Sequence, residues 1–166
     1  EVGGNNWAAD HPEILWKKAK AAYKEKDKAQ AYLYVGIILH YVQDMGVPAH
    51  AYRIIHQNKP HNWDAIEVLG FFDFHADLKT EGVADPKLDD PVEYIAWSGQ
   101  TARDHFESVY PGEKYHRGFF PQGYSDLDET HWAFLRRREG DCTRGTAYAL
   151  EAAARVLKLA GELESP

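Results

Sequence analysis

The sequence lacks the long apolar run of a membrane-spanning helix, and it has almost no cysteine. No stretch of about 18 apolar residues occurs, so we expect no transmembrane segment. The longest apolar stretch, around Tyr32 to Leu39, is too short and contains Gly36. Cys142 is the only cysteine, so no disulfide can form within the chain. Redox chemistry therefore does not settle the cellular compartment.

Positive charge is also scarce: the chain has 19 Lys and Arg residues and 26 Asp and Glu residues, which gives a formal net charge of −7. An acidic protein is a poor general binder of nucleic acid, since neutralising phosphates requires clustered Lys and Arg. The only compact basic run is Arg136-Arg137-Arg138, which we interpret as a solvated helix face. We therefore expect no stable complex with nucleic acid.

Apolar and aromatic residues are plentiful: 44% of the chain is hydrophobic, with five Trp, ten Tyr and seven Phe. This composition favours a globular fold, and the length fits one domain over residues 1–166. Clean period-two alternation, internal repeats and linker-like tracts are all lacking. The sequence therefore predicts an all-α, single-domain bundle of about six helices.

Capping residues and apolar spacing predict where these helices lie. Residues Leu33, Gly36, Ile37 and His40 recur at i, i+3, i+4 and i+7, so we expect them to form a buried face that His40 and Asp44 continue. Residues 111–124 are rich in Gly, Pro and aromatic residues and predict a long ordered loop. The predicted helices cover about 14–24, 27–44, 61–78, 90–109 and 125–138, with a final helix that follows Gly140-Asp141 and ends near 162.

The most informative stretch lies at the end of the second predicted helix. His40 and Asp44 are four residues apart, so they share one helical face. Gly46 and Pro48 then stop the helix, and His50 follows just beyond the break. Imidazole nitrogen and carboxylate oxygen are donors that zinc prefers, at roughly 2.0–2.2 Å. This pattern is typical of part of a metal site.

A second candidate pair begins the third predicted helix. His61 and Asp64 are three residues apart and also share a helical face, as metal ligands do in helical bundles. Glu67 lies about 240° away from His61 in helical rotation, so we rank it below Asp64. The alternative interpretation, that Asp64 and Glu67 are first-turn carboxylates favoured by the helix dipole, is equally compatible with the sequence.

Together these residues form the array H-x3-D-x5-H-x10-H-x2-D, and this array resembles the zinc core of the zinc-dependent phospholipase C and single-strand-specific nuclease superfamily. The match is best at Leu39-His40-Tyr41-Val-Gln-Asp44 and the following Pro48-Ala-His50-Ala51. The preceding stretch from Asp27 to Gly36 and the Gly145-Thr146-Ala147 stretch are also similar to that superfamily. The resemblance covers about residues 10–78 and 141–160.

The resemblance implies a largely helical enzyme that holds one to three zinc ions and hydrolyses phosphodiesters by metal-activated water. His40 and Asp44 would bind one metal, and Asp44 would bridge to a neighbour and accept a proton from the water. His50, His61 and Asp64 would bind another. The family usually has three residues between the last His and its carboxylate, whereas this chain has two, which we interpret as a one-residue deletion.

The chain departs from the family pattern at its N-terminal side. Trp7 and the following His11 resemble the start of the mature family proteins, in which the N-terminal Trp binds metal. Six residues precede Trp7, so its nitrogen is an amide unless processing exposes it. The family also places an Asp and a His before the central motif, yet only Asp27 lies between His11 and His40. The site therefore holds fewer metals or recruits substitutes such as His56, Asp73, His75 or Asp77.

Several other polar residues have a more ordinary interpretation. Asp10 resembles a helix N-cap more than a proton acceptor. Cys142 lacks any activating signature and is interpreted as structural. His105, His116 and His131 have no carboxylate or His partner at metal-like helical spacing, and His131-Trp132 favours packing. The same holds for the aromatic residues of the long loop, namely Tyr115, Phe119, Phe120 and Tyr124.

These observations favour a zinc-dependent phosphodiesterase of the phospholipase C type, with a phospholipid or another phosphodiester as substrate and transient contact with a membrane surface. A single-strand nuclease on the same scaffold is the alternative enzyme. A metal-binding helical domain that has lost catalysis, or a bundle whose histidines only form hydrogen bonds, remains open. We expect a secreted or periplasmic protein, and the polar stretch Glu1-Val-Gly-Gly-Asn-Asn shows no signal peptide.

Overall fold

The regular structure of this protein is helical. The computed structural model describes residues 11–54, 84–116, 118–121 and 126–162, and this part of the chain contains helices and no strand. The predicted all-α class is confirmed. The helices are α1 (His11–Lys24), α2 (Lys28–Met45), α3 (Pro48–Ala51), α5 (Glu93–Val109) and α6 (Glu129–Glu162).

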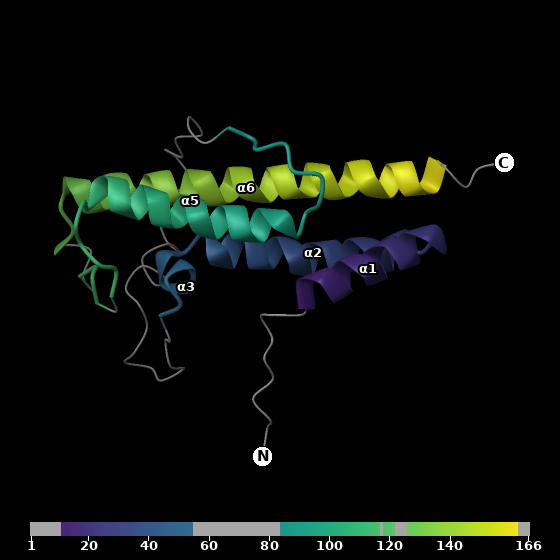
Figure 1. Cartoon of the computed structure of the whole chain (residues 1–166), viewed down its shortest axis with the longest axis horizontal. Coiled ribbons are helices and arrows are strands. Elements are labelled where there is room, and N and C mark those ends of the chain that lie inside the picture. The colour runs from purple at the N-terminus through teal and green to yellow at the C-terminus, as the bar shows by residue number, and fades with distance from the viewer. Residues whose placement is uncertain (1–10, 55–83, 117, 122–125, 163–166) are drawn as a thin grey trace, which may run out of the picture.

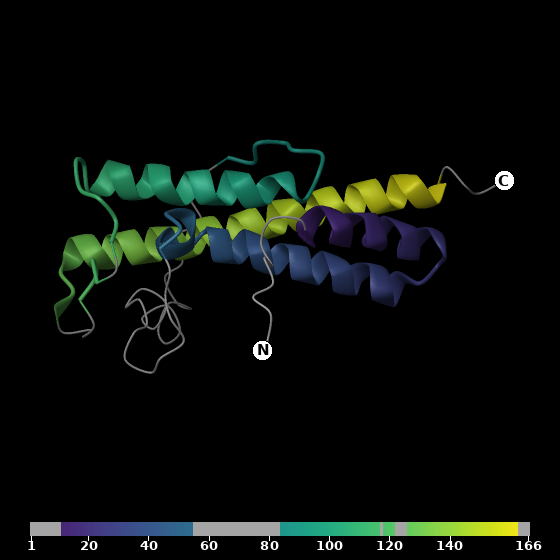
Figure 2. The same ribbon diagram turned by 60° about the horizontal axis from the view of Figure 1, so that its bottom comes forward.

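The long helix α6 runs the length of the molecule, and the other helices pack along it (Figure 1). Helix α5 lies alongside its N-terminal half, whereas α1 lies near its C-terminal half. Helix α2 lies between them and contacts α1, α3, α5 and α6 (Figure 2). The short α3 continues from the end of α2 and packs against α5. The end of α2, which carries the candidate ligands, packs against α5 and α6, where Met45 lies against Gly99 and Gly46 lies against Cys142.

The core consists of three buried clusters that follow α6 from one end to the other. Phe106, Phe120 and Phe134 centre the first, between α5, the 115–121 loop and the start of α6. Val42, Tyr94 and the alanines of mid-α6 form the second. The third packs Trp16 of α1 and Val35 and Ile38 of α2 against Ala153 and Leu157. The aromatic residues predicted to pack, Tyr115, Phe119 and Phe120, do so, and Tyr124 lies outside the described residues.

Local sequence signals explain where most of these helices begin and end. The side chain of Asp27 accepts a hydrogen bond from the Gln30 backbone N–H at 3.0 Å, which caps α2. Asp90 accepts one from the Val92 N–H at 2.9 Å just before α5. Gly46 ends α2 as predicted, but its φ of −71° is ordinary. A Cβ at this position would overlap the Sγ atom of Cys142, so close packing is what requires glycine.

Two of the predicted helices are one. The predicted break at Gly140-Asp141 is wrong, because α6 continues without interruption from residue 129 to residue 162. Asp141 receives hydrogen bonds from Arg137, one turn before it, and from Arg144, one turn after it. These bonds, together with the packing of α2 and α5 against the same turns, offset the roughly 1 kcal/mol cost of a mid-helix glycine.

Candidate functional site

The candidate metal ligands His40 and Asp44 lie on the last turns of α2 and face each other. The Nε2 atom of His40 is 3.5 Å from the Oδ2 atom of Asp44. Their side chains are 67% and 38% exposed, so both can reach a ligand from solvent. The i, i+4 spacing predicted from the sequence therefore does bring an imidazole and a carboxylate together on one open surface.

The predicted buried face of α2 is wrong. Leu33, Ile37 and His40 are exposed, with Leu33 at 57%. The buried positions are instead Ala31, Val35, Ile38 and Val42, which form a stripe rotated around the helix. Because α2 is apolar on both stripes, its periodicity alone did not identify the buried one. Because the stripe from Ala31 to Val42 packs inward, His40 and Asp44 face outward.

His50 lies on α3, which α5 holds in place. Arg103 of α5 donates a hydrogen bond to the backbone carbonyl of Ala51 at 2.9 Å, and Tyr52 donates one to Glu107 at 3.2 Å. Within the described ranges, no group of three or more His, Cys, Asp or Glu side chains is placed to hold a metal ion. The structure thus places His40 beside Asp44. Within the described residues, His50 does not form a three-ligand group with them.

The remaining predicted ligands fall outside what the structure describes. His11 begins α1, but its side chain lies outside the part of the chain that the structure describes. His61 and Asp64 lie outside the described residues, as do Trp7 and Asp10. The same is true of the substitutes His56, Asp73, His75 and Asp77. Their part in a metal site stays a prediction.

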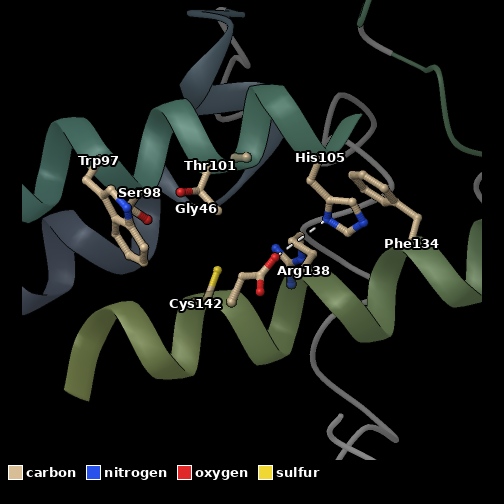
Figure 3. A pocket seen from close by; sticks show the side chains of 10 residues that line it. Gly46, Trp97, Ser98, Thr101, His105, Phe134, Arg138 and Cys142 are labelled. Carbon is tan, nitrogen blue, oxygen red and sulfur yellow. Dashed lines mark ion pairs between the residues drawn. The ribbon is translucent and has the colours of Figure 1, made fainter. Parts of the chain in front are cut away.

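The sequence reasoning missed a second polar cluster, which lies between α5 and α6 (Figure 3). Asp141 is buried and accepts hydrogen bonds from Arg137 Nε at 3.0 Å and from Arg144 Nη2 at 2.7 Å. The Nδ1 atom of His105, on α5, is 3.7 Å from Asp141 Oδ2. His105 therefore does have a carboxylate partner, which helical spacing along α5 did not reveal because Asp141 belongs to α6. The only local signal was the placement of Arg137 and Arg144 one turn on either side of Asp141.

Burial controls the titration of this cluster. Desolvation of the half-buried ring lowers the pKa of His105, while the charge of Asp141 acts in the opposite direction. Burial also raises the pKa of the Cys142 thiol to about 11, which keeps it protonated and unreactive. Neither group has the properties of a nucleophile, and this agrees with the structural interpretation of Cys142.

Arg138 corrects the interpretation of the basic run as a solvated face. Its side chain is only 9% exposed, and Nη2 donates a hydrogen bond to Glu139 at 2.9 Å. It lines a small cavity with about 10 Å³ of free space between α5 and α6. The polar residues that line this cavity are Ser98, Thr101, His105, Arg138, Asp141 and Cys142.

His131 packs as predicted, against Tyr110 and Phe120. The prediction that it has no carboxylate partner at helical spacing is wrong, because its Nδ1 atom is 2.8 Å from Oδ1 of Asp128, three residues before it. This pair resembles His40–Asp44 in chemistry but stands at the start of α6. It is therefore a useful internal comparison for the candidate site.

Comparison with known proteins identifies no relative. No family model matches the chain, and neither the curated proteins nor the solved structures contain a match. None of the helices that the structure describes is both long and apolar enough to cross a membrane.

Proposed function

We propose that this protein is a zinc-dependent hydrolase of phosphodiester bonds, of the phospholipase C type. The observation that supports it is the His40–Asp44 pair, in which an imidazole nitrogen and a carboxylate oxygen lie 3.5 Å apart on an exposed surface. The motif around this pair, which continues through His50 to His61 and Asp64, is the one that resembles the zinc phospholipase C and nuclease superfamily.

The donor chemistry of this pair fits zinc. Imidazole nitrogen and carboxylate oxygen are both zinc ligands, and a catalytic site usually takes three protein ligands. His40 and Asp44 would supply two of them, and we assign the others from the sequence to His11, His50, His61 and Asp64. When bound, zinc polarises a phosphoryl oxygen and lowers the pKa of water to about 7.

The residues of the chain have separate roles in the proposed reaction. Asp44 accepts the proton of the attacking water, which its exposed carboxylate can approach. His40, whose Nε2 atom lies 3.5 Å from Asp44 Oδ2, presents its imidazole to the same site as a metal ligand. A phospholipid is the proposed substrate, met during transient contact with a membrane surface. The net charge of −7 disfavours single-stranded nucleic acid, the alternative substrate.

Substitution at Asp44 tests this proposal. Asp44→Asn keeps the shape of the side chain but removes its charge, so we expect kcat/KM to fall about 10²–10⁴-fold, the range typical of a proton-accepting group. The assay is release of diacylglycerol from phosphatidylcholine by the zinc-loaded full chain. Elemental analysis of the same samples should show at least one zinc per wild-type chain.

Asp128→Asn is the matched control, because Asp128 also pairs with a histidine on a helix. We expect its activity and zinc content to equal those of the wild type. A wild-type chain that binds no added zinc contradicts the proposal. Zinc binding without turnover of phosphatidylcholine favours a domain that has lost catalysis, and release of mononucleotides from single-stranded DNA identifies a nuclease.

A further inference from the structure

We propose that the buried end of Arg138, in the cavity between α5 and α6, binds a small monovalent anion such as chloride. Chloride here means the free inorganic ion, and the site is separate from the His40–Asp44 pair. Three observations on α6 carry this inference: an excess of buried positive charge, unpaired guanidinium donors, and a cavity of matching size.

The buried charge does not balance. The three least exposed ionic side chains of the cluster are Arg138, Arg144 and Asp141, at 9%, 11% and 9% exposure. Glu139 pairs with Arg138 at 2.9 Å, and Asp141 is shared by Arg137 and Arg144. Three guanidiniums therefore meet two carboxylates, and the cluster keeps one positive charge. Arginine cannot lose its proton in a protein, so this charge persists at every ordinary pH.

The guanidinium donors are also incompletely satisfied. The Nε atom of Arg138 and the Nε and Nη1 atoms of Arg144 are buried, and no hydrogen-bond acceptor pairs with them in the part of the chain that the structure describes. A buried charged donor without an acceptor is costly, typically by more than the roughly 1–3 kcal/mol of a neutral one. Of these two arginines, Arg138 is the one that lines the cavity. An anion there therefore supplies an acceptor to Arg138 Nε and offsets the excess charge of the cluster.

The cavity beside Arg138 limits what this acceptor is. Its free space of about 10 Å³ is close to that of one water molecule. A monatomic anion fits with slight movement of the surrounding side chains, whereas a tetrahedral phosphate or sulfate does not. Thr101 adds a hydroxyl donor to the same lining.

Asp141 does not prevent an anion from binding. Its Oδ1 atom accepts from Arg137 and Arg144 at 3.0 and 2.7 Å. Its Oδ2 atom accepts from Arg137 at 3.2 Å and lies 3.7 Å from His105. Both carboxylate oxygens therefore face donors, and the carboxylate charge is already compensated. A neutral water would satisfy the Arg138 Nε–H but would leave the excess charge.

Thermal unfolding at constant ionic strength tests the proposal. Sodium chloride replaces sodium gluconate stepwise, because gluconate is too large for the cavity. We expect the Tm of the wild-type chain to rise with chloride concentration, since a ligand that binds only the folded state stabilises it. Arg138→Met should abolish this rise, and Arg136→Met, which changes the neighbouring arginine of the same helix, should retain it.

An anomalous bromide signal gives a second measurement that does not depend on a variant. In crystals of the wild-type chain grown with bromide, we expect a peak within hydrogen-bonding distance of Arg138 Nε. Equal Tm values in chloride and gluconate would overturn the proposal, as would a chloride response that survives in Arg138→Met. A bromide-free cavity would also overturn it. Stabilisation by sulfate as large as that by chloride would contradict the size argument.

Discussion

At the scale of single residues, two glycines of α2 have opposite surroundings. A Cβ on Gly46 would overlap Cys142 Sγ and lie 3.2 Å from the Gln43 carbonyl, whereas a Cβ on Gly36 meets nothing within 4 Å. We expect Gly46→Ala to lower the free energy of unfolding by about 1–3 kcal/mol through overpacking. Gly36→Ala should raise it by about 0.5–1 kcal/mol, because alanine favours the helix. Urea unfolding of both variants measures the difference.

The contact with Cys142 also supplies the control for Gly46. Shortening the opposing side chain in Gly46→Ala/Cys142→Ala makes room for the new methyl group, so much of the lost stability should return. Equal unfolding free energies for Gly46→Ala and Gly36→Ala would mean that α2 and α6 do not approach each other closely at this point.

We expect the partly buried His105 to make stability depend on pH. Its pKa is lowered in the folded protein, mainly by burial, so the unfolded chain binds a proton more readily. The contribution of neutral His105 to the free energy of unfolding is therefore fully present above the unfolded pKa of about 6.5. It is lost as the pH falls from there through the lower pKa of the folded protein. His105→Gln should lose less stability than the wild type between pH 7 and pH 5. The measurement is urea unfolding at each pH.

Leu150→Ala provides the comparison for this pH effect, because it removes no titratable group from the chain. This variant should keep the wild-type dependence of unfolding free energy on pH. If His105→Gln and the wild type lose the same stability between pH 7 and pH 5, burial of His105 has no effect on its titration.

At the scale of whole elements, sequence signals located helix ends better than helix faces. Asp27 marked the start of α2 correctly, because a capping side chain acts on its own backbone within three residues. Asp90 marked the turn just before α5, where it accepts a hydrogen bond from the Val92 N–H, and the helix begins at Glu93. The buried face of α2 and the continuity of α6 depend on which helices pack against them. Those contacts join residues far apart in the sequence, so no local pattern encodes them.

Two leucines of α6 lie on faces of the helix that differ in solvent exposure. Leu157 is fully buried against α1 and α2, whereas Leu150 is 42% exposed. We expect Leu157→Ala to lower the free energy of unfolding by about 2–5 kcal/mol, from lost burial and the cavity left behind. Leu150→Ala, the same change on the same helix, should cost well under half as much. Thermal or urea unfolding of the two variants gives the comparison, and equal costs would contradict the assigned face.

At the scale of the whole molecule, the sequence predicted the fold class and the His40–Asp44 pair, but not the separate polar cluster between α5 and α6. Helical caps and the absence of alternation were sufficient for an all-α fold. The His40–Asp44 pair was predictable because both residues lie on one helix. The Arg138, Asp141 and His105 cluster was not, since it forms only when α5 meets α6. Pairs of residues within one helix can therefore be predicted from the sequence, whereas contacts between helices cannot.

The packing of α6 against both α1 and α5 also orders the steps of folding. Helices α1 and α2 are adjacent in the sequence and can pair early, at a small cost in loop entropy. The contact of Leu157 with α1 closes a loop that contains most of the chain, and such distant contacts slow folding. We expect this contact to form after the rate-limiting step. The Leu157→Ala loss should then appear in stopped-flow kinetics as faster unfolding, with little change in the refolding rate.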